Sequence, residues 1–170
     1  KRARIYADML KVKEIGFFDK RRDYSKIVNG KNPIIEHKYI GGDVSSKDII
    51  IVDDMIASGG SILDVAKQLK EKGANKIFLM ATFALFTNGY EIFDEYYDKG
   101  IINRIYTTNL TYVDDTIKKR KWFSEVDCSL YIAEIIDRLS NHQSISDIIN
   151  KKEIVKIRKR TLWGDDNDVF

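Results

Sequence analysis

Short apolar runs along the chain alternate with stretches in which apolar residues recur at helical spacing. Ile49–Val52 is a continuous β-branched run, which is typical of a strand buried on both faces of a parallel sheet. After it, apolar residues recur at helical spacing from Ile62 to Leu69, and Gly73 stands where such a helix would end. Strands that alternate with helices predict an α/β fold, with a mostly parallel sheet and helices on both faces.

The remaining elements follow from the same two periodicities. Ser61 and Asp64 form an S-x-x-D signal for the start of that helix. The polar stretch 24–42, which holds the only proline, Pro33, predicts a mobile excursion in which Tyr39–Ile40 pairs with a neighbouring strand. The other expected helices are 3–10, 90–99 and 129–139, and the other expected strands are 14–18, 76–82, 102–106 and 122–126.

The length of 170 residues allows one domain with a substantial hydrophobic core. We expect this domain to occupy 1–150. A charged tail, basic first and then acidic, is expected at 151–170. The chain begins at Lys1 without Met and enters an amphipathic pattern at once. We therefore expect it to be part of a longer protein.

The charge and the cysteine content exclude several classes of protein. Lysine and arginine number 29 against 26 aspartates and glutamates, and the net charge of +3 is too small to indicate a nucleic-acid partner. No apolar run approaches the roughly 18 residues that a membrane-spanning helix needs, so no membrane partner is expected. A single cysteine, Cys128, rules out an internal disulfide and is typical of the reducing cytoplasm.

A small-residue loop between the strand at 49–52 and the following helix is the main candidate for a binding site. Ligands of open α/β sheets bind beyond the carboxyl ends of the strands, and Asp53 and Asp54 stand at that edge. The backbone N–H groups of such a loop, with the positive end of the helix dipole, suit a phosphate dianion. The carboxylates suit sugar hydroxyls, or a Mg²⁺ ion that such hydroxyls also contact. The loop consists of Ala57, Ser58, Gly59, Gly60 and Ser61.

Other interpretations of this loop fit the residues less well. No lysine follows the glycines, so the loop is not a nucleoside-triphosphate P-loop. The aspartates precede the glycines, which is the wrong order for a dinucleotide-binding fingerprint. Asp53–Asp54 and Gly59–Gly60 each suit an ordinary turn, but their combination between a strand and a helix favours a sugar-phosphate site.

The segment VDDMIASGGS, residues 52–61, resembles the phosphoribosyl-pyrophosphate-binding motif of the type I phosphoribosyltransferase fold. The order of KRARIYAD, GFFDKRRD, GGDV, this loop, ATFALFTNG and NHQSIS resembles the C-terminal half of the ribose-phosphate pyrophosphokinase family, over about residues 1–148. The loop is specific for the fold, whereas DKRR and NHQSIS favour the pyrophosphokinases over the related transferases. The resemblance implies a type I phosphoribosyltransferase-like domain.

The resemblance also implies a ribose-phosphate diphosphokinase of nucleotide biosynthesis. Such an enzyme transfers diphosphate from ATP to ribose 5-phosphate and gives phosphoribosyl pyrophosphate and AMP. Lys20 and Arg22 match the family's catalytic basic pair on a flexible loop. Asp53 and Asp54 match its ribose-hydroxyl contacts, and Ala57–Ser61 match its 5-phosphate cradle. The family depends on Mg²⁺, whose ligands lie mostly in the other half, so no metal ligand is assigned to this chain.

The family's members are homo-oligomers, often hexamers built from dimers, so the resemblance implies self-association. An aromatic-rich region at 83–97 is one candidate for the interface. Packing inside the domain is the alternative that we favour for it. The aromatic residues of this region are Phe83, Phe86, Tyr90, Phe93, Tyr96 and Tyr97.

Two residues depart from the family's pattern. Ala57 stands where most pyrophosphokinases have an acidic residue, and Phe83 replaces a histidine in an A-T-H segment. The C-terminal half alone is expected to be inactive if catalysis requires the family's usual residues at these two positions, or the N-terminal half. One alternative is a phosphoribosyltransferase of nucleotide salvage, which needs a segment that stacks on the base, and the sequence identifies none. The other is a catalytically silent, regulatory homologue that binds sugar phosphates.

Overall fold

The structure, a computed structural model, describes residues 2–22, 25 and 34–149 of the chain. The chain divides into two compact units, which are Lys1–Val126 (unit 1) and Asp127–Phe170 (unit 2). The tail expected at 151–170 lies outside the described residues, so the boundary expected at residue 150 stays a prediction.

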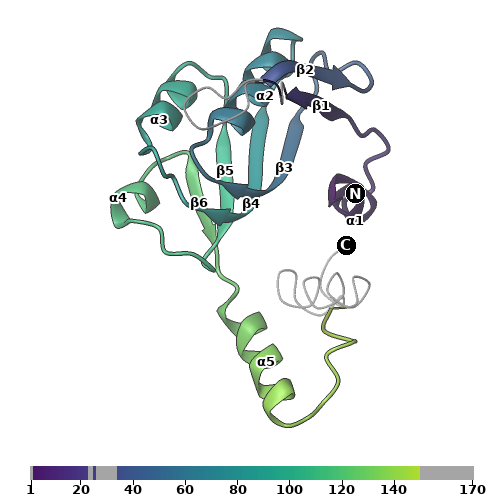
Figure 1. The fold of residues 1–170 in the computed structure, drawn as a ribbon, viewed down its shortest axis with the longest axis vertical. Coiled ribbons are helices and arrows are strands. Elements are labelled where there is room, and N and C mark those ends of the chain that lie inside the picture. Colours follow the sequence, from purple (N-terminus) through teal and green to yellow (C-terminus); the bar gives the residue numbers. More distant parts are fainter. Residues whose placement is uncertain (1, 23–24, 26–33, 150–170) are drawn as a thin grey trace, which may run out of the picture. The chain divides into compact units, whose positions relative to one another are not determined.

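A four-stranded parallel sheet forms the centre of unit 1 (Figure 1). Its strands are, in spatial order, β3 (Ile49–Ile56), β4 (Ile77–Ala84), β5 (Arg104–Thr108) and β6 (Phe123–Val126). The helices between them are α2 (Gly60–Glu71), α3 (Glu91–Asp98) and α4 (Asp115–Lys118). The predicted α/β class is confirmed. The short α4 was not predicted, because 4 residues are too few to show a helical repeat.

The core of unit 1 combines aliphatic residues of the strands with a cluster of aromatic rings. Phe86 meets Phe93 edge to face at 5.0 Å between ring centroids, and Phe93 stacks on Trp122 at 5.6 Å. All three side chains are buried, so each ring contributes both apolar burial and favourable ring geometry. Packing inside the domain, which we favoured for the aromatic region 83–97, is therefore confirmed at Phe86 and Phe93.

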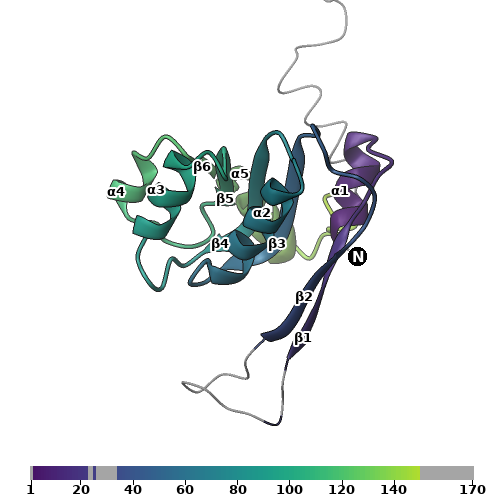
Figure 2. The same cartoon turned by 90° about the horizontal axis from the view of Figure 1, so that it is seen from above.

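A two-stranded antiparallel hairpin forms a separate sheet in unit 1 (Figure 2). Its strands are β1 (Phe17–Arg22) and β2 (Ile34–Ile40), and helix α1 (Arg2–Leu10) precedes them. Phe18 pairs with Tyr39 in the register, with ring centroids 5.4 Å apart, which confirms the predicted pairing of Tyr39–Ile40 with a neighbouring strand. The strand predicted at 14–18 is wrong in its bounds. Pairing with β2 continues β1 through the charged residues Asp19–Arg22, because tertiary context overrides strand propensity.

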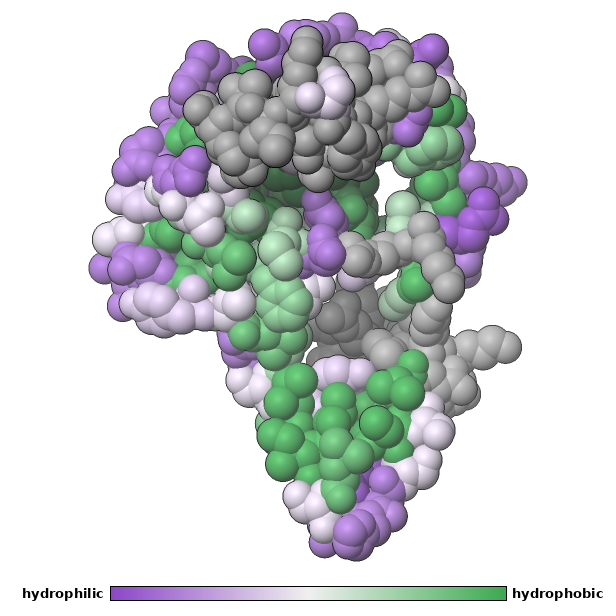
Figure 3. Space-filling view, in the orientation of Figure 1, coloured by the Kyte–Doolittle hydropathy of each residue, from purple (hydrophilic) through white to green (hydrophobic). Residues whose placement is uncertain are grey.

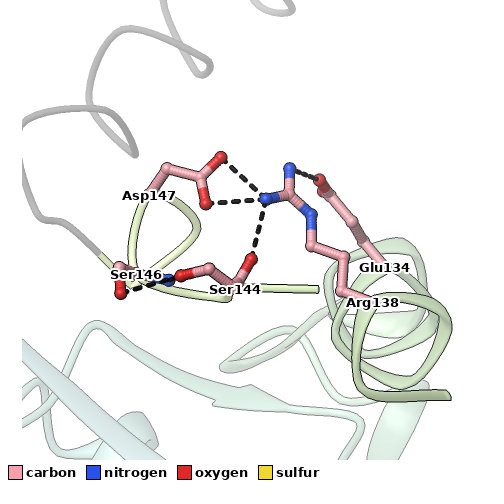
Figure 4. Close-up of polar contacts among 5 residues, drawn as sticks. All are labelled: Glu134, Arg138, Ser144, Ser146 and Asp147. Atoms are coloured by element: carbon pink, nitrogen blue, oxygen red, sulfur yellow. Dashed lines mark hydrogen bonds and ion pairs between the residues drawn. The ribbon is translucent and has the colours of Figure 1, made fainter. Parts of the chain in front are cut away.

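The described part of unit 2 contains helix α5 (Ser129–Ser140), in which no residue is buried. Apolar side chains gather on its surface (Figure 3). Polar contacts hold the turn that follows the helix. Arg138 lies 2.6 Å from Asp147 and 2.9 Å from Glu134 in two ion pairs (Figure 4). Hydrogen bonding between Arg138 and Asp147 raises the pKa of the guanidinium and lowers the pKa of the carboxyl.

No helix within residues 2–22 or 34–149 combines the length and the apolar character that crossing a membrane requires. This finding agrees with the short apolar runs in the sequence.

Candidate functional site

The carboxyl end of β3 carries the two acidic residues that were predicted to contact a sugar. The sequence had suggested that Asp53 and Asp54 follow the strand. They belong to it, because β3 continues to Ile56. Asp53 Oδ1 accepts a hydrogen bond from the backbone N–H of Asp54 at 2.8 Å. Asp54 Oδ1 accepts one from the N–H of Met55 at 3.1 Å. These bonds hold both carboxylates close to the backbone at the end of the strand.

The loop that follows β3 leads directly into the N-terminus of α2. The residue that caps α2 is Gly59, which has a φ of 83° and makes no side-chain cap hydrogen bond. The predicted start signal is wrong, because Ser61 and Asp64 lie inside the helix, where Asp64 accepts a hydrogen bond from Gln68 at 2.9 Å. The first N–H groups of a helix have no acceptor within it and carry the positive end of its dipole. The N-terminus of α2 therefore suits an anion.

The buried ring of Phe93, from α3, fixes the shape of this loop. A Cβ atom on Gly59 would lie 2.2 Å from Phe93 Cζ, a distance that real Cβ contacts do not reach. Gly59 is also required by its left-handed backbone, which L side chains rarely adopt. Gly60 differs, because a Cβ atom there would come no closer than 3.9 Å to Ser58 Oγ. The two glycines of the loop thus have different roles, and only Gly59 is fitted to the core.

Backbone hydrogen bonds join the loop to the segment that follows β4. The N–H of Leu85 donates to the carbonyl of Ile56 at 2.8 Å, and the N–H of Thr87 donates to the carbonyl of Ala57 at 3.0 Å. On the helix side, the N–H of Leu63 donates to the carbonyl of Gly59 at 3.0 Å. The loop is therefore held at both ends, which preorganises its N–H groups for a ligand.

A cavity of about 890 Å³ lies along β3 within unit 1. Asp53 and Ser61 line it, together with apolar residues of α1, β3 and α2. Its volume is in the range of small-molecule sites. Asp54 and residues 57–60 do not line this cavity. Of the two aspartates, only Asp53 lines this cavity.

Lys20 and Arg22 lie on β1, where they pair in the register with His37 and Ile34 of β2. The expected flexible loop is wrong for these two positions, because both belong to the hairpin. Residues 23–24 and 26–33, which continue the expected excursion, lie outside the described residues. β1 pairs with β2 and is not a strand of the sheet that carries Asp53. Lys20 and Arg22 therefore do not lie on the same sheet as Asp53 and the loop that follows β3.

The described residues include no group of three or more histidine, cysteine, aspartate or glutamate side chains that could hold a metal ion. Asp53 and Asp54 nevertheless provide the hard oxygen ligands that Mg²⁺ prefers. This ion commonly keeps several waters and is bound by one or two carboxylates together with substrate phosphates. The two aspartates therefore fit a Mg²⁺ ion that arrives with a phosphate substrate.

Two features that shape the site were not predicted. One is the ring of Phe93 against Gly59, and the other is the pair of hydrogen bonds from Leu85 and Thr87 to the loop. In the sequence, Phe93 was one of the aromatic residues of region 83–97, for which packing inside the domain was favoured. Its contact with a glycine on another element is tertiary, and no local pattern in the sequence predicts it.

The fold and the loop define the class of the protein as an α/β domain of the phosphoribosyltransferase type. The crystal structure of phosphoribosylpyrophosphate synthetase from Mycobacterium smegmatis has the same fold. It aligns with a TM-score of 0.62 at 22% sequence identity, over 83% of this chain and 42% of that one. At this identity, the likeness is evidence for the fold alone.

The sequence itself identifies the family. The model of the phosphoribosyl synthetase-associated domain matches residues 18–150, and the chain belongs to this family. The ribose-phosphate pyrophosphokinase of Mycoplasmopsis pulmonis is 31% identical over 151 residues, which are 88% of this chain and 44% of that protein. The enzyme of that name from Shewanella oneidensis is 33% identical over 145 residues, 85% of this chain and 43% of that protein. The chain thus spans less than half the length of these relatives.

Proposed function

We propose that this domain binds ribose 5-phosphate for a Mg²⁺-dependent ribose-phosphate diphosphokinase. The observation that carries the proposal is the loop Ala57–Ser61, which follows Asp53 and Asp54 and leads into the N-terminus of α2. Its residue Gly59 lies against the ring of Phe93. The loop N–H groups and the helix dipole bind the 5-phosphate. The two carboxylates accept hydrogen bonds from the ribose hydroxyls.

In the proposed reaction, the anomeric hydroxyl oxygen of ribose 5-phosphate attacks the β-phosphorus of ATP. The bond from that phosphorus to the oxygen shared with the α-phosphate breaks, AMP leaves, and the hydroxyl proton is released. Every group at the reaction centre carries or gains negative charge, so catalysis requires alignment and cations. Lys20 and Arg22 supply cationic groups for the transferred diphosphate. Mg²⁺, when bound with the phosphates, would neutralise part of their charge.

The relatives are named for ribose-phosphate pyrophosphokinase activity, and this supports ATP as the second substrate. We also propose a homo-oligomer built from dimers. The single cysteine, Cys128, supports a location in the reducing cytoplasm.

The first experiment measures the binding of ribose 5-phosphate to the protein by calorimetry. Asp53→Asn keeps the shape of the side chain but removes its charge, and should weaken binding by roughly 10- to 100-fold, as expected for a charge-assisted hydrogen bond. The matched control is Asp98→Asn, which changes an exposed carboxylate at the end of α3 and should have no effect. Equal affinity of the Asp53 variant and the unchanged protein would contradict the assigned role.

The full-length protein, supplied with ATP and Mg²⁺, tests the reaction. AMP should form only when ribose 5-phosphate is present, and Lys20→Ala should reduce the rate by orders of magnitude without changing the melting temperature. Turnover of phosphoribosyl pyrophosphate with adenine or orotate, and none with ATP, would instead identify a phosphoribosyltransferase. Binding of ribose 5-phosphate without either reaction, in the full-length protein, would identify a silent homologue.

A further inference from the structure

β3 is an edge strand of the four-stranded sheet, although its sequence is that of a central strand. The β-branched run Ile49–Val52 is typical of a strand that is buried on both faces. None of these four side chains is buried, however, and Ile50 is 43% exposed. Within the described residues, β3 pairs with β4 on one side and with no strand on the other. Natural proteins usually cover or charge such an edge, because its backbone groups attract other strands.

The cavity of about 890 Å³ beside β3 lies at this edge of the strand. All five residues from Ile49 to Asp53 line it. Successive side chains of a strand point to opposite faces, so a space on one face of the sheet would be lined by every second residue. A space that is lined by five residues in a row therefore runs along the edge, where the backbone groups lie.

The backbone N–H groups of β3 alternate between the two sides of the strand. Ile49 donates its N–H to the carbonyl of Lys76, the residue before β4, at 2.7 Å. The N–H groups of Ile50 and Val52 therefore point away from β4. The next outward N–H group, that of Asp54, donates to Asp53 Oδ1 at 2.8 Å. The outward donors beside the cavity are thus those of Ile50 and Val52.

One face of α1 forms the opposite wall of the cavity. The residues of this helix that line it are Ala3, Tyr6, Ala7 and Leu10. Their spacing places them on the same side of the helix. α1 contacts β3 and lies on the β3 side of the sheet (Figure 1). A groove thus runs between apolar side chains of the helix and backbone hydrogen-bonding groups of the strand.

We propose that this groove receives one further strand, parallel to β3, from the part of the full-length protein that precedes α1. The chain spans less than half the length of its pyrophosphokinase relatives, so they have a long segment available. A strand that leads directly into α1, and from there through the hairpin to β3, makes the crossover connection that joins neighbouring parallel strands. Its backbone pairs with β3, and its side chains cover α1. The inference does not depend on the binding of ribose 5-phosphate.

Two other occupants fit the groove less well. A cavity of about 890 Å³ has room for a segment of chain but not for a second domain, and α1 obstructs the approach of another copy's sheet. A small molecule leaves most of the backbone groups along Ile49–Asp53 without partners. A strand of five residues is about 17 Å long, which is the length of this stretch, and it pairs with the whole row.

The first test is residue-level amide hydrogen exchange in the full-length protein. With the added strand in place, the N–H groups of Ile50 and Val52 should exchange about as slowly as that of Ile51, which faces β4. Exchange at both positions that is faster than at Ile51 by roughly 100-fold or more would show an open edge and overturn the inference.

The second test identifies the segment that covers the edge. A photo-reactive phenylalanine derivative is placed at Ile50 of the full-length protein, and the cross-linked peptides are identified by mass spectrometry. They should come from the residues that directly precede Lys1. The matched control carries the same group at Leu110, which is 41% exposed and follows β5, and it should give no such cross-link. Cross-links from Ile50 to another segment or to a second copy, or none beyond those of the control, would overturn the inference.

Discussion

The loop Ala57–Ser61 of unit 1 and the turn after α5 in unit 2 are both short connections beside a helix, but different forces hold them. Gly59 is fitted against the buried ring of Phe93, and the loop is bonded to the segment after β4. The turn after α5 depends on Arg138, whose partners Asp147 and Glu134 are largely exposed to water. Burial excludes water and makes geometry rigid, whereas exposed ion pairs stabilise little. A binding loop gains precision when its support is apolar.

The largest effect is expected from the apolar support. Phe93→Ala removes a fully buried ring, and such substitutions typically cost about 3–5 kcal/mol. For a chain of this size the melting temperature should fall by roughly 6–20 °C, as measured by calorimetry. The control is Tyr97→Ala, which removes an aromatic ring of the same helix that is only partly buried. Equal losses in the two variants would mean that the ring under the loop has no special role.

A smaller effect on stability, with a larger effect on binding, is expected at the loop itself. Gly59→Ala forces an L residue into a left-handed backbone, at about 1–2 kcal/mol, and pushes its Cβ against Phe93. The loop should shift, and binding of ribose 5-phosphate should be lost. Gly60→Ala is the matched control, because its Cβ would make only an ordinary contact, 3.9 Å from Ser58 Oγ, and it should bind nearly as well as the unchanged protein. Equal affinity of the two alanine variants for ribose 5-phosphate would contradict the special role assigned to Gly59.

The smallest effect is expected in unit 2, and it depends on pH. The pKa of Asp147 is lowered from 3.8 by hydrogen bonding to Arg138. Its contribution is therefore present above that value and disappears as the pH falls through the lowered pKa of the folded state. Amide hydrogen exchange of α5 should be slightly faster in Asp147→Asn than in the unchanged protein near neutral pH. This difference should vanish in acid, and a difference that grows in acid would refute the assignment.

Much of the fold followed from periodicity alone. β3, β4 and α2 were predicted because parallel strands and amphipathic helices leave strong local patterns at these residues. β1 was misplaced, because its charged residues are held in a strand by pairing with β2, and the sequence predicted such pairing only for Tyr39–Ile40. The hairpin is a product of long-range contacts, and so are the bounds of its strands.

The candidate loop was found in the sequence because its chemistry is local. Backbone N–H groups, glycines and the two aspartates occupy adjacent positions, so that one segment carries the whole pattern. The contacts between Phe93 and Gly59, and between Thr111 and Ala84, join residues that are distant in the chain. Neither contact follows from spacing or composition, since both depend on how the sheet orders its strands.

The absence of a side-chain cap at the start of α2 has a thermodynamic consequence. In many helices a serine or aspartate satisfies the first turn, but Gly59 has no group to offer. An anion in that place completes the helix and thereby stabilises the folded state by an amount that grows with the logarithm of its concentration. Under the proposed function, the melting temperature of this domain rises with the concentration of ribose 5-phosphate.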